Sequence, residues 1–231
     1  MFGIILTSII TVFHVYVLWR AWSMPLIKSR VPSTVYAAAG VLLWAVFVSG
    51  RLLGHGQTGI LAQSLEFAGM TWMAILFLCT VCLLITEFLT CFGLVFPRKA
   101  PAMRGVALIL GGLLSVIALV QGVRPPVITH YDVNLCGLPR VLDGTVIVAM
   151  SDLHLGSQLG GKWLEKRIAQ VHKEHPDLVL LLGDIFEGHG VFPEDLFSAL
   201  DNLHAPLGVF AVPGNHEFHG SDNTGLKMIE A

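Results

Sequence analysis

The chain has 231 residues, of which 54% are hydrophobic and only 13% are charged. That balance is too apolar for one ordinary soluble domain, and the formal net charge of −2 hides an uneven distribution. Through Arg124 there are eight basic and two acidic residues, whereas the rest of the chain has six basic and fourteen acidic residues. We therefore expect a membrane half, residues 1–124, and an acidic soluble half, residues 125–231. Because no basic stripe with interleaved aromatic residues occurs, no nucleic acid is expected as a binding partner.

Four apolar stretches in the first half are long enough to cross a bilayer as helices, which takes about 20 mostly apolar residues. They cover residues 2–22, 34–53, 67–96 and 105–123, and they predict four transmembrane spans. The first stretch has neither a basic start nor a small-residue cleavage site, so it is interpreted as a span and not as a signal peptide. The third stretch is longer than the hydrocarbon core requires, so it must tilt, kink or project from the bilayer.

Basic residues are concentrated around the two loops that would lie on the same side of the membrane. The positive-inside rule places these loops in the cytoplasm. The N-terminus and the soluble half are then extracytoplasmic, and the chain is expected to be a multi-pass protein of the cell (inner or plasma) membrane. The residues that decide this orientation are Arg20, Lys28, Arg30, Arg98, Lys99 and Arg104.

Glu87 is the one acidic residue inside a predicted span. A charge at the centre of a bilayer costs roughly 2.5–3.5 kcal/mol on insertion scales. Two interpretations are open: a functional role within the membrane, or a hydrated position near one interface at the end of the overlong third stretch.

The soluble half alternates between strand and helix patterns after Arg124-Pro125-Pro126 ends the fourth span. The order of strand, helix, strand, helix and strand implies right-handed crossovers and a parallel sheet. Leu178–Leu182 is continuously apolar, as expected of a strand covered on both faces. The expected strands are 127–133, 145–150, 178–182 and 209–212, and the expected helices are 163–175, 193–203 and the beginning of one at 227–231.

Three polar motifs directly follow these strands. Asp152 and His154 come after the strand at 145–150, Asp184 follows the strand at 178–182, and Asn215 and His216 follow the strand at 209–212. Open parallel sheets bind ligands at the carboxyl ends of their strands, so these side chains are expected to meet at one edge. Carboxylate and amide oxygens together with imidazole nitrogens are suited to divalent metal ions.

The three motifs, DxH, GD and GNHE, resemble the calcineurin-like metallophosphoesterases over residues 138–231. That family's pattern continues with a lone His and a GHxH block. The four preceding spans and the phrase LDGTVIVAMSDLHLG look like the membrane-anchored bacterial members. The resemblance implies a fold of two parts: an α-helical transmembrane region with four spans, and then an α/β metallophosphoesterase domain. The chain would hold the N-terminal βαβαβ part of that domain's four-layer α/β/β/α sandwich.

The resemblance also implies a role for each motif residue. Asp152 and His154 would bind a first metal ion, Asp184 would bridge two ions, and Asn215 would bind the second ion. His216 would be catalytic, lying beside the phosphate to protonate the leaving oxygen or to stabilise the transition state. The cofactors would be two divalent metal ions, Mn, Fe or Zn.

The chain departs from the family pattern after the third motif, because neither the later His nor GHxH occurs before Ala231. Of the second ion's family ligands, only Asp184 and Asn215 remain. The sequence is therefore expected to be C-terminally incomplete. Glu217, the last residue of GNHE, is expected to orient its neighbours and not to bind metal.

The leading functional hypothesis is a membrane-anchored, metal-dependent phosphohydrolase with a two-metal site. Its substrate would be a phosphate ester, and its place at a bilayer suggests a lipid-linked one. One alternative is a non-catalytic membrane protein whose incomplete phosphoesterase-like domain binds metal or a partner. Another is a transporter or channel subunit with an appended domain, in which Glu87 would matter for flux.

Overall fold

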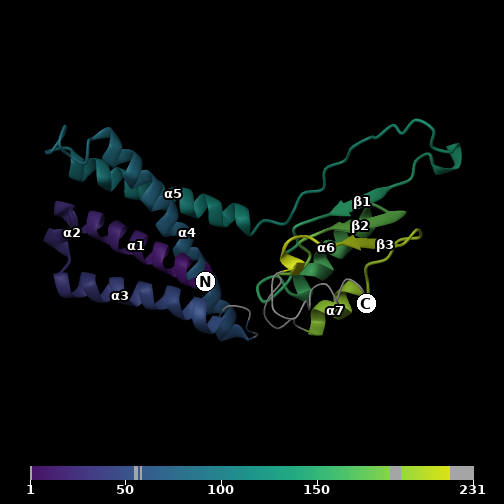
Figure 1. The fold of residues 1–231 in the computed structure, drawn as a ribbon, viewed down its shortest axis with the longest axis horizontal. Helices are drawn as coiled ribbons and strands as arrows, with labels where there is room; N and C mark the ends of the chain where they lie inside the picture. The colour runs from purple at the N-terminus through teal and green to yellow at the C-terminus, as the bar shows by residue number, and fades with distance from the viewer. Residues whose placement is uncertain (1, 55–56, 58, 188–193, 219–231) are drawn as a thin grey trace. The chain divides into compact units, whose positions relative to one another are not determined.

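The computed structural model describes residues 2–54, 57, 59–187 and 194–218 (Figure 1). They fall into two compact units. The first unit combines residues 1–54 with 64–128, and the second combines 55–63 with 129–231. The first is made of apolar helices, and the second contains a small parallel sheet with two helices.

The first unit contains four helices that are long and apolar enough to cross a membrane, within the part of the chain that the structure describes. The chain is thus a membrane protein, and the prediction of four spans is confirmed. Its elements are α1 (Phe2–Trp22), α2 (Pro25–Arg30), α3 (Ser33–Ser49) with a π-helical turn at Gly50–Gly54, α4 (Ile60–Leu89) and α5 (Ala100–Gly122).

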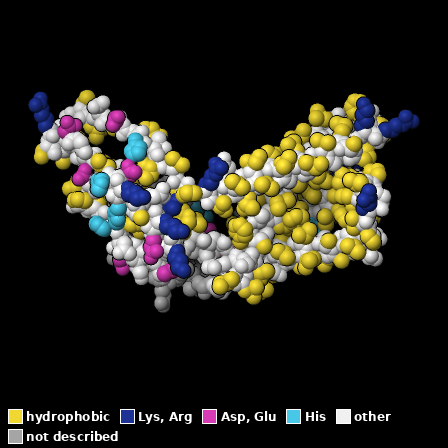
Figure 2. Space-filling model, turned by 180° about the vertical axis from the view of Figure 1, so that it is seen from behind, with side chains coloured by type: hydrophobic (Ala, Val, Ile, Leu, Met, Phe, Trp, Pro, Cys, Tyr) yellow, Lys and Arg dark blue, Asp and Glu magenta, His cyan; other side chains and the backbone are white. Residues whose placement is uncertain are grey.

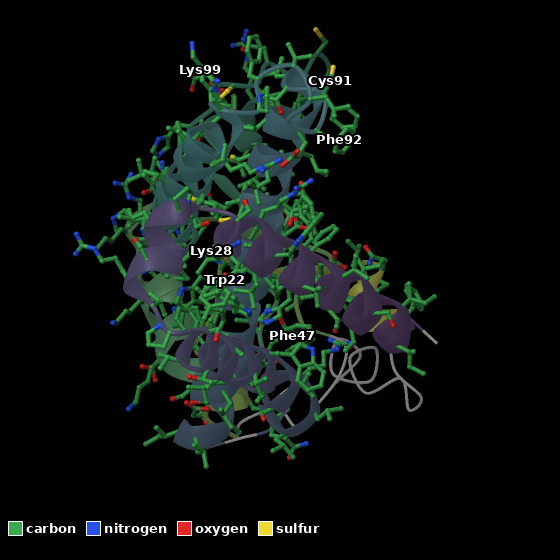
Figure 3. All side chains as sticks on the ribbon, turned by 90° about the vertical axis from the view of Figure 1, so that its left-hand side faces the viewer. Trp22, Lys28, Phe47, Cys91, Phe92 and Lys99 are labelled. Atoms are coloured by element: carbon green, nitrogen blue, oxygen red, sulfur yellow. The ribbon has the colours of Figure 1, made fainter. Side chains whose placement is uncertain are left out.

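The predicted bounds of the third span, 67–96, are wrong, because α4 runs from Ile60 to Leu89. After Leu89 the chain turns through left-handed conformations at Cys91 (φ 47°), Phe92 (φ 57°) and Gly93 (φ 88°). Figure 3 shows Cys91 and Phe92 at this turn. The apolar residues that follow are exposed, Leu94 at 82%, so hydrophobicity continues past the end of the helix. Composition alone therefore could not locate that end.

The helices of the first unit pack through small and apolar residues, as is typical of membrane bundles. A Cβ atom at Gly111 of α5 would lie only 2.8 Å from the Cα of Cys79 in α4, so the two backbones approach closely there. Leu76 and Leu83 of α4 are completely buried in the same core. The outward surface is largely hydrophobic, and Lys and Arg side chains lie at one end of it (Figure 2).

The second unit is a three-stranded parallel sheet with strand order β1-β2-β3. The sequence-based strands 178–182 and 209–212 are confirmed to the residue, and the strand expected from 145 begins at Ile147. The elements are β1 (Ile147–Met150), α6 (Gly161–Lys173), β2 (Leu178–Leu182), α7 (Glu194–Leu200) and β3 (Val209–Val212), with 3-10 turns at Arg140–Leu142 and His216–Phe218.

Helices α6 and α7 form the core of this unit with one face of the sheet. Leu164 of α6 and Leu196 of α7 are completely buried with Val179 of β2. Side chains alternate between faces along each strand, and the opposite face is open: Leu182 of β2 is 50% exposed and Phe210 of β3 is 59% exposed. The apolar run of β2 is typical of a strand covered on both faces, but among the described residues only one face of the sheet is covered.

The strand expected at 127–133 is also wrong. This segment is irregular and exposed, with Val127 at 88%, Tyr131 at 82% and Val133 at 72% exposure. Its alternating apolar pattern fits a strand, but strand formation also needs a neighbouring ladder. In the described structure, β1 pairs only with β2, so no strand takes up this segment. The helix expected from residue 227 lies outside the described residues.

Candidate metal centre

The first two motifs lie side by side because the pairing of β1 with β2 continues past the strands. The Asp152 N–H donates to the Gly183 carbonyl at 3.1 Å, and the His154 N–H donates to the Asp184 carbonyl at 3.0 Å. Leu155 and Phe186 then form an isolated parallel bridge. The DLH and GD segments are thus fixed against each other by backbone hydrogen bonds at the carboxyl edge of the sheet.

Backbone strain is concentrated at this edge. Asp152, His154 and Asp184 have φ angles of 55°, 45° and 50°, and they are three of the six non-glycine residues with positive φ in the described structure. A left-handed backbone conformation is disfavoured for residues with a Cβ atom, and it persists only where the surrounding structure enforces it. Such residues are often found at functional sites. All three are residues for which the sequence predicted metal binding.

Two glycines allow the second and third motifs to touch. Gly183 has a φ of 83°, and a Cβ atom there would lie 2.9 Å from the Cα of Gly214. A Cβ atom at Gly214 would overlap the carboxylate and the backbone nitrogen of Asp184. The close approach brings the third motif against Asp184.

The third motif turns back toward the first two in a 3-10 turn, His216–Phe218. The His216 N–H donates to Oδ1 of Asp184 at 2.9 Å. The His216 ring lies edge-on to the His154 ring, with centroids 4.5 Å apart and planes at 79°. As a result, one ligand atom each of His154, Asp184 and His216 lies within 4.8 Å of the other two.

The His216 ring is further oriented by the backbone of the second motif. Its Nδ1 lies 3.3 Å from the Glu187 carbonyl, which can only accept a hydrogen bond. This contact favours a proton on Nδ1, and Nε2 is then the nitrogen with a lone pair that an ion could accept. A backbone carbonyl behind a ligating imidazole is a common way to set its tautomer in metal sites.

Glu217 joins the second and third motifs by hydrogen bonds to their backbones. Its side chain has no exposed surface. Oε2 accepts the N–H of Gly214 at 2.7 Å and of Asp184 at 3.0 Å, and Oε1 accepts the N–H of Phe186 at 2.9 Å. Glu217 therefore fixes the backbone on both sides of Asp184, in agreement with the expectation that it orients its neighbours.

The structure brings together three of the five predicted site residues. His154, Asp184 and His216 are half-buried and form the cluster just described, whereas Asp152 and Asn215 are exposed beside it. The sequence predicted that these side chains meet at one edge of the sheet, and His216 does lie beside His154 and Asp184. Nothing in the sequence predicted that Glu217 accepts three backbone N–H groups, apart from its being the acidic last residue of GNHE. His189 and His219, which lie near these motifs in sequence, are outside the described residues.

The cluster fits a divalent transition metal by its chemistry. Two imidazole nitrogens and a carboxylate oxygen are ligands that Zn, Mn and Fe accept. Three protein ligands leave coordination positions open for water and substrate, as catalytic sites do. A second ion would need further oxygen ligands, and Asp152 and Asn215 are the predicted residues next to the cluster that carry them.

Known proteins are similar to this chain over the same region. Residues 145–228 match the family model described as Calcineurin-like phosphoesterase. A Bos taurus protein named "Transmembrane protein with metallophosphoesterase domain" is 30% identical over 125 residues, which cover 54% of this chain and 28% of that protein. An uncharacterised metallophosphoesterase of Campylobacter jejuni is 27% identical over 122 residues, covering 53% of this chain and 32% of that protein.

A third relative has a named reaction. The UDP-2,3-diacylglucosamine pyrophosphatase of Chlamydia trachomatis is 33% identical over 114 residues, covering 41% of this chain and 35% of that protein. The chain thus spans about a third or less of the length of the relatives described here. No solved structure matches the chain.

Proposed function

Residues 145–228 belong to a calcineurin-like metallophosphoesterase domain, and from this premise we propose that the chain is a membrane-anchored, metal-dependent phosphoesterase. The family match confirms the resemblance drawn from DxH, GD and GNHE. The observation that carries the proposal is the convergence of His154, Asp184 and His216 within 4.8 Å at the carboxyl edge of a parallel sheet.

We assign the motif residues to two divalent ions, which when bound would activate water and neutralise phosphoryl charge. Asp152, His154 and Asp184 would hold the first ion, and Asp184 with Asn215 would hold the second. Support comes from the position of Asp184, whose carbonyl accepts the His154 N–H and whose Oδ1 accepts the His216 N–H.

His216 is proposed to act on the phosphate oxygens. Its ring is held between His154 and the Glu187 carbonyl, so Nε2 has a fixed direction. In the protonated ring, Nδ1 donates to the Glu187 carbonyl and Nε2 donates to a phosphoryl or leaving oxygen. Proton transfer from Nε2 to the leaving oxygen would complete cleavage of the ester bond.

A lipid-linked phosphate ester or diphosphate is the proposed substrate class. The four apolar helices keep the domain at a bilayer, where phosphate groups of lipids are concentrated. The Chlamydia trachomatis relative is named for a diacylated sugar nucleotide, which is a lipid-bearing diphosphate. We also propose that the membrane is the plasma membrane and that the soluble half is extracytoplasmic, because the basic residues of the first half gather near the loops of one side.

The test is hydrolysis of bis(p-nitrophenyl) phosphate by the purified chain with Mn²⁺, compared between Asp184→Ala and Asp201→Ala. Asp201 is an exposed aspartate of the same unit outside the cluster. We expect Asp184→Ala to lower kcat/KM by at least about 100-fold, since it removes the shared ligand, and Asp201→Ala to change it less than about twofold. Equal activity of the wild type and Asp184→Ala would contradict the proposal. Tight Mn²⁺ binding in calorimetry without turnover would support the non-catalytic alternative.

A further inference from the structure

An ionic cluster lies inside the helical unit, far from the metal centre in sequence. Glu87 of α4 is completely buried. Nε and Nη2 of Arg104 in α5 donate to its two carboxylate oxygens at 2.6 and 3.1 Å. Nε of Arg20 in α1 lies 3.1 Å from Oε1. Of the two interpretations left open, the hydrated position is contradicted, since Glu87 is enclosed in a cluster to which α1, α4 and α5 each contribute a charge. Its place near the end of α4 agrees with the sequence.

The cluster carries more positive than negative charge. Two guanidinium groups share one carboxylate, and both arginine side chains are about nine-tenths buried. Arg104 uses both carboxylate oxygens in a bidentate pair, so Arg20 is left with the weaker contact. A charge left over in a low-dielectric setting attracts a further anion strongly.

Two buried polar atoms at Arg20 and its neighbour Tyr16 have unmet hydrogen-bonding capacity. Among the described residues, the buried Nε of Arg20 and the buried Oη of Tyr16 have no hydrogen-bond partner. The Arg20 N–H is thus near Glu87 without being aligned on it. The Arg20 guanidinium lies 4.1 Å from the Trp19 ring centroid and 5.7 Å from that of Tyr16. Buried donors usually have partners, so these atoms point to a missing acceptor next to Arg20.

The depth of the cluster matches the position of lipid phosphates. Arg20 and Glu87 are each the third residue from the end of their helices, and Arg104 is the fifth residue of α5. At about 1.5 Å per residue, all three lie about 3–6 Å inside the helix ends. The 21 residues of α1 span about 31 Å, close to the roughly 30 Å of hydrocarbon, so the helix ends lie at the boundary between acyl chains and headgroups. The three residues lie just inside that boundary, within reach of a phosphate for a long arginine side chain.

An apolar groove shares the Trp19 ring with Arg20. It has a volume of about 610 Å³ and lies between α1 and α3, and Trp19 belongs to its lining. The same Trp19 ring stacks on the Arg20 guanidinium. Further lining residues are Val15, Leu18, Trp22, Tyr36 and Val41. A molecule with an anionic group at Arg20 would thus have an apolar channel for a chain directly beside it.

The same end of the unit also carries exposed basic residues. Lys28 and Arg30 of α2 and Arg98 and Lys99 of the turn before α5 are exposed there. Figure 3 shows Lys28 and Lys99 projecting at this end. Each basic residue near an anionic bilayer surface adds about 1 kcal/mol of attraction. These exposed residues would gather anionic lipids around the buried cluster without fixing one in place.

We propose that Arg20, with Glu87 and Arg104 behind it, is a binding site for the phosphate of one anionic phospholipid, whose acyl chain lies in the groove between α1 and α3. The planar guanidinium can donate two parallel hydrogen bonds to phosphate oxygens, which an ammonium group cannot do. Glu87 holds Arg104 fully and Arg20 partly, so that Arg20 stays ordered and still has N–H groups to donate. Bound lipid would tie α1 to α3 at this end of the bundle.

The first test uses native mass spectrometry of the full chain in neutral detergent, titrated with dioctanoyl-phosphatidylglycerol or dioctanoyl-phosphatidylcholine. We expect phosphatidylglycerol to be retained at least about tenfold more tightly. If the wild type retains phosphatidylglycerol and phosphatidylcholine equally, the proposal is overturned, and no variant is needed to decide it. Inorganic phosphate is the third probe: if it displaces phosphatidylglycerol completely at the same concentration, the ligand is a free phosphate and not a lipid.

Variants then locate the site. Arg20→Gln is expected to abolish the tenfold preference, whereas Lys28→Gln, a matched change at an exposed residue of the same end, should alter it less than about twofold. Glu87→Gln should strengthen phosphatidylglycerol binding several-fold, because the competing carboxylate charge is gone. If the cluster only joins the helices, Glu87→Gln would weaken or not change lipid binding, and Arg20→Gln would match Lys28→Gln. Either result would overturn the assignment.

Discussion

Each half of the molecule holds a carboxylate with no exposed surface, and the two are neutralised in different ways. Glu87 in the helical unit contacts the guanidinium groups of Arg104 and Arg20. Glu217 in the sheet unit accepts three backbone N–H groups, from Gly214, Asp184 and Phe186. One is an ionic cluster of side chains, and the other is a carboxylate held by the main chain.

The two carboxylates have different partners because backbone N–H groups are available in one unit and not in the other. Inside a transmembrane helix each N–H is already used within the helix, so a buried carboxylate must find its partners among side chains. At the carboxyl ends of parallel strands the ladder stops, and loop N–H groups point inward without partners of their own. A single acidic residue can satisfy several of them and fix the loops that carry the metal ligands.

The largest expected effect is on the sheet unit. Glu217→Ala leaves one buried and two half-buried N–H groups without an acceptor, and we expect the stability of this unit to fall by about 4 kcal/mol. Hydrogen exchange at the amides of β1, β2 and β3 measures this loss. Glu165→Gln, at an exposed position on α6, should leave the exchange rates unchanged. Protection of the sheet in Glu217→Ala equal to that of the wild type would show that the main-chain contacts are dispensable.

A smaller loss is expected in the helical unit. Glu87→Ala leaves two buried guanidinium groups without a counter-charge and should destabilise the bundle by about 3 kcal/mol. The readout is the apparent melting temperature in neutral detergent, with Arg30→Gln at an exposed position as control. Added phosphatidylglycerol should restore part of the melting temperature. An unchanged melting temperature would mean that water, and not Glu87, solvates the two arginines.

Gly214→Ala tests the close approach of the second and third motifs. The new methyl group would overlap the Asp184 carboxylate, so we expect a loss of about 2 kcal/mol and weaker Mn²⁺ binding. Gly160→Ala is the control, because a Cβ atom there would meet only the Gly156 carbonyl, at 4.0 Å. Wild-type Mn²⁺ affinity in Gly214→Ala would show that the motifs need not touch.

The smallest effect should come from replacing the whole ionic cluster. Changing Arg20, Glu87 and Arg104 to methionine together removes every charge of the ionic cluster, and the stability should stay within about 1 kcal/mol of the wild type. No comparable exchange exists for Glu217, because only proline lacks a backbone N–H and it would also change the backbone conformation. A triple variant less stable than Glu87→Ala would contradict this difference between the halves. Detergent melting curves decide it.

Much of this arrangement could be predicted from the sequence. The strands Leu178–Leu182 and Val209–Val212 are short apolar runs between turn residues, so their bounds were clear. The motifs follow these strands directly, and the parallel sheet brings them to one edge. The strand predicted at 127–133 is absent because an alternating pattern does not show whether a partner strand is present.

Contacts between distant elements could not be predicted in the same way. Glu87 and Arg104 lie on the helices before and after a tight turn at Cys91 to Gly93. A hydropathy pattern does not reveal the left-handed backbone of that turn. The approach of Arg20 depends on how α1 packs against α4. The position of His216 beside His154 likewise depends on the turn that Glu217 holds in place.

The most direct test of the central claim is to locate the metal. Crystals of the protein grown with Mn²⁺ should give an anomalous difference peak in contact with His154 and Asp184, beside His216. His154→Ala should remove or weaken that peak, while His175→Ala, at an exposed histidine of the same unit, should leave it unchanged. A peak away from Asp184, or none at saturating Mn²⁺, would contradict the account.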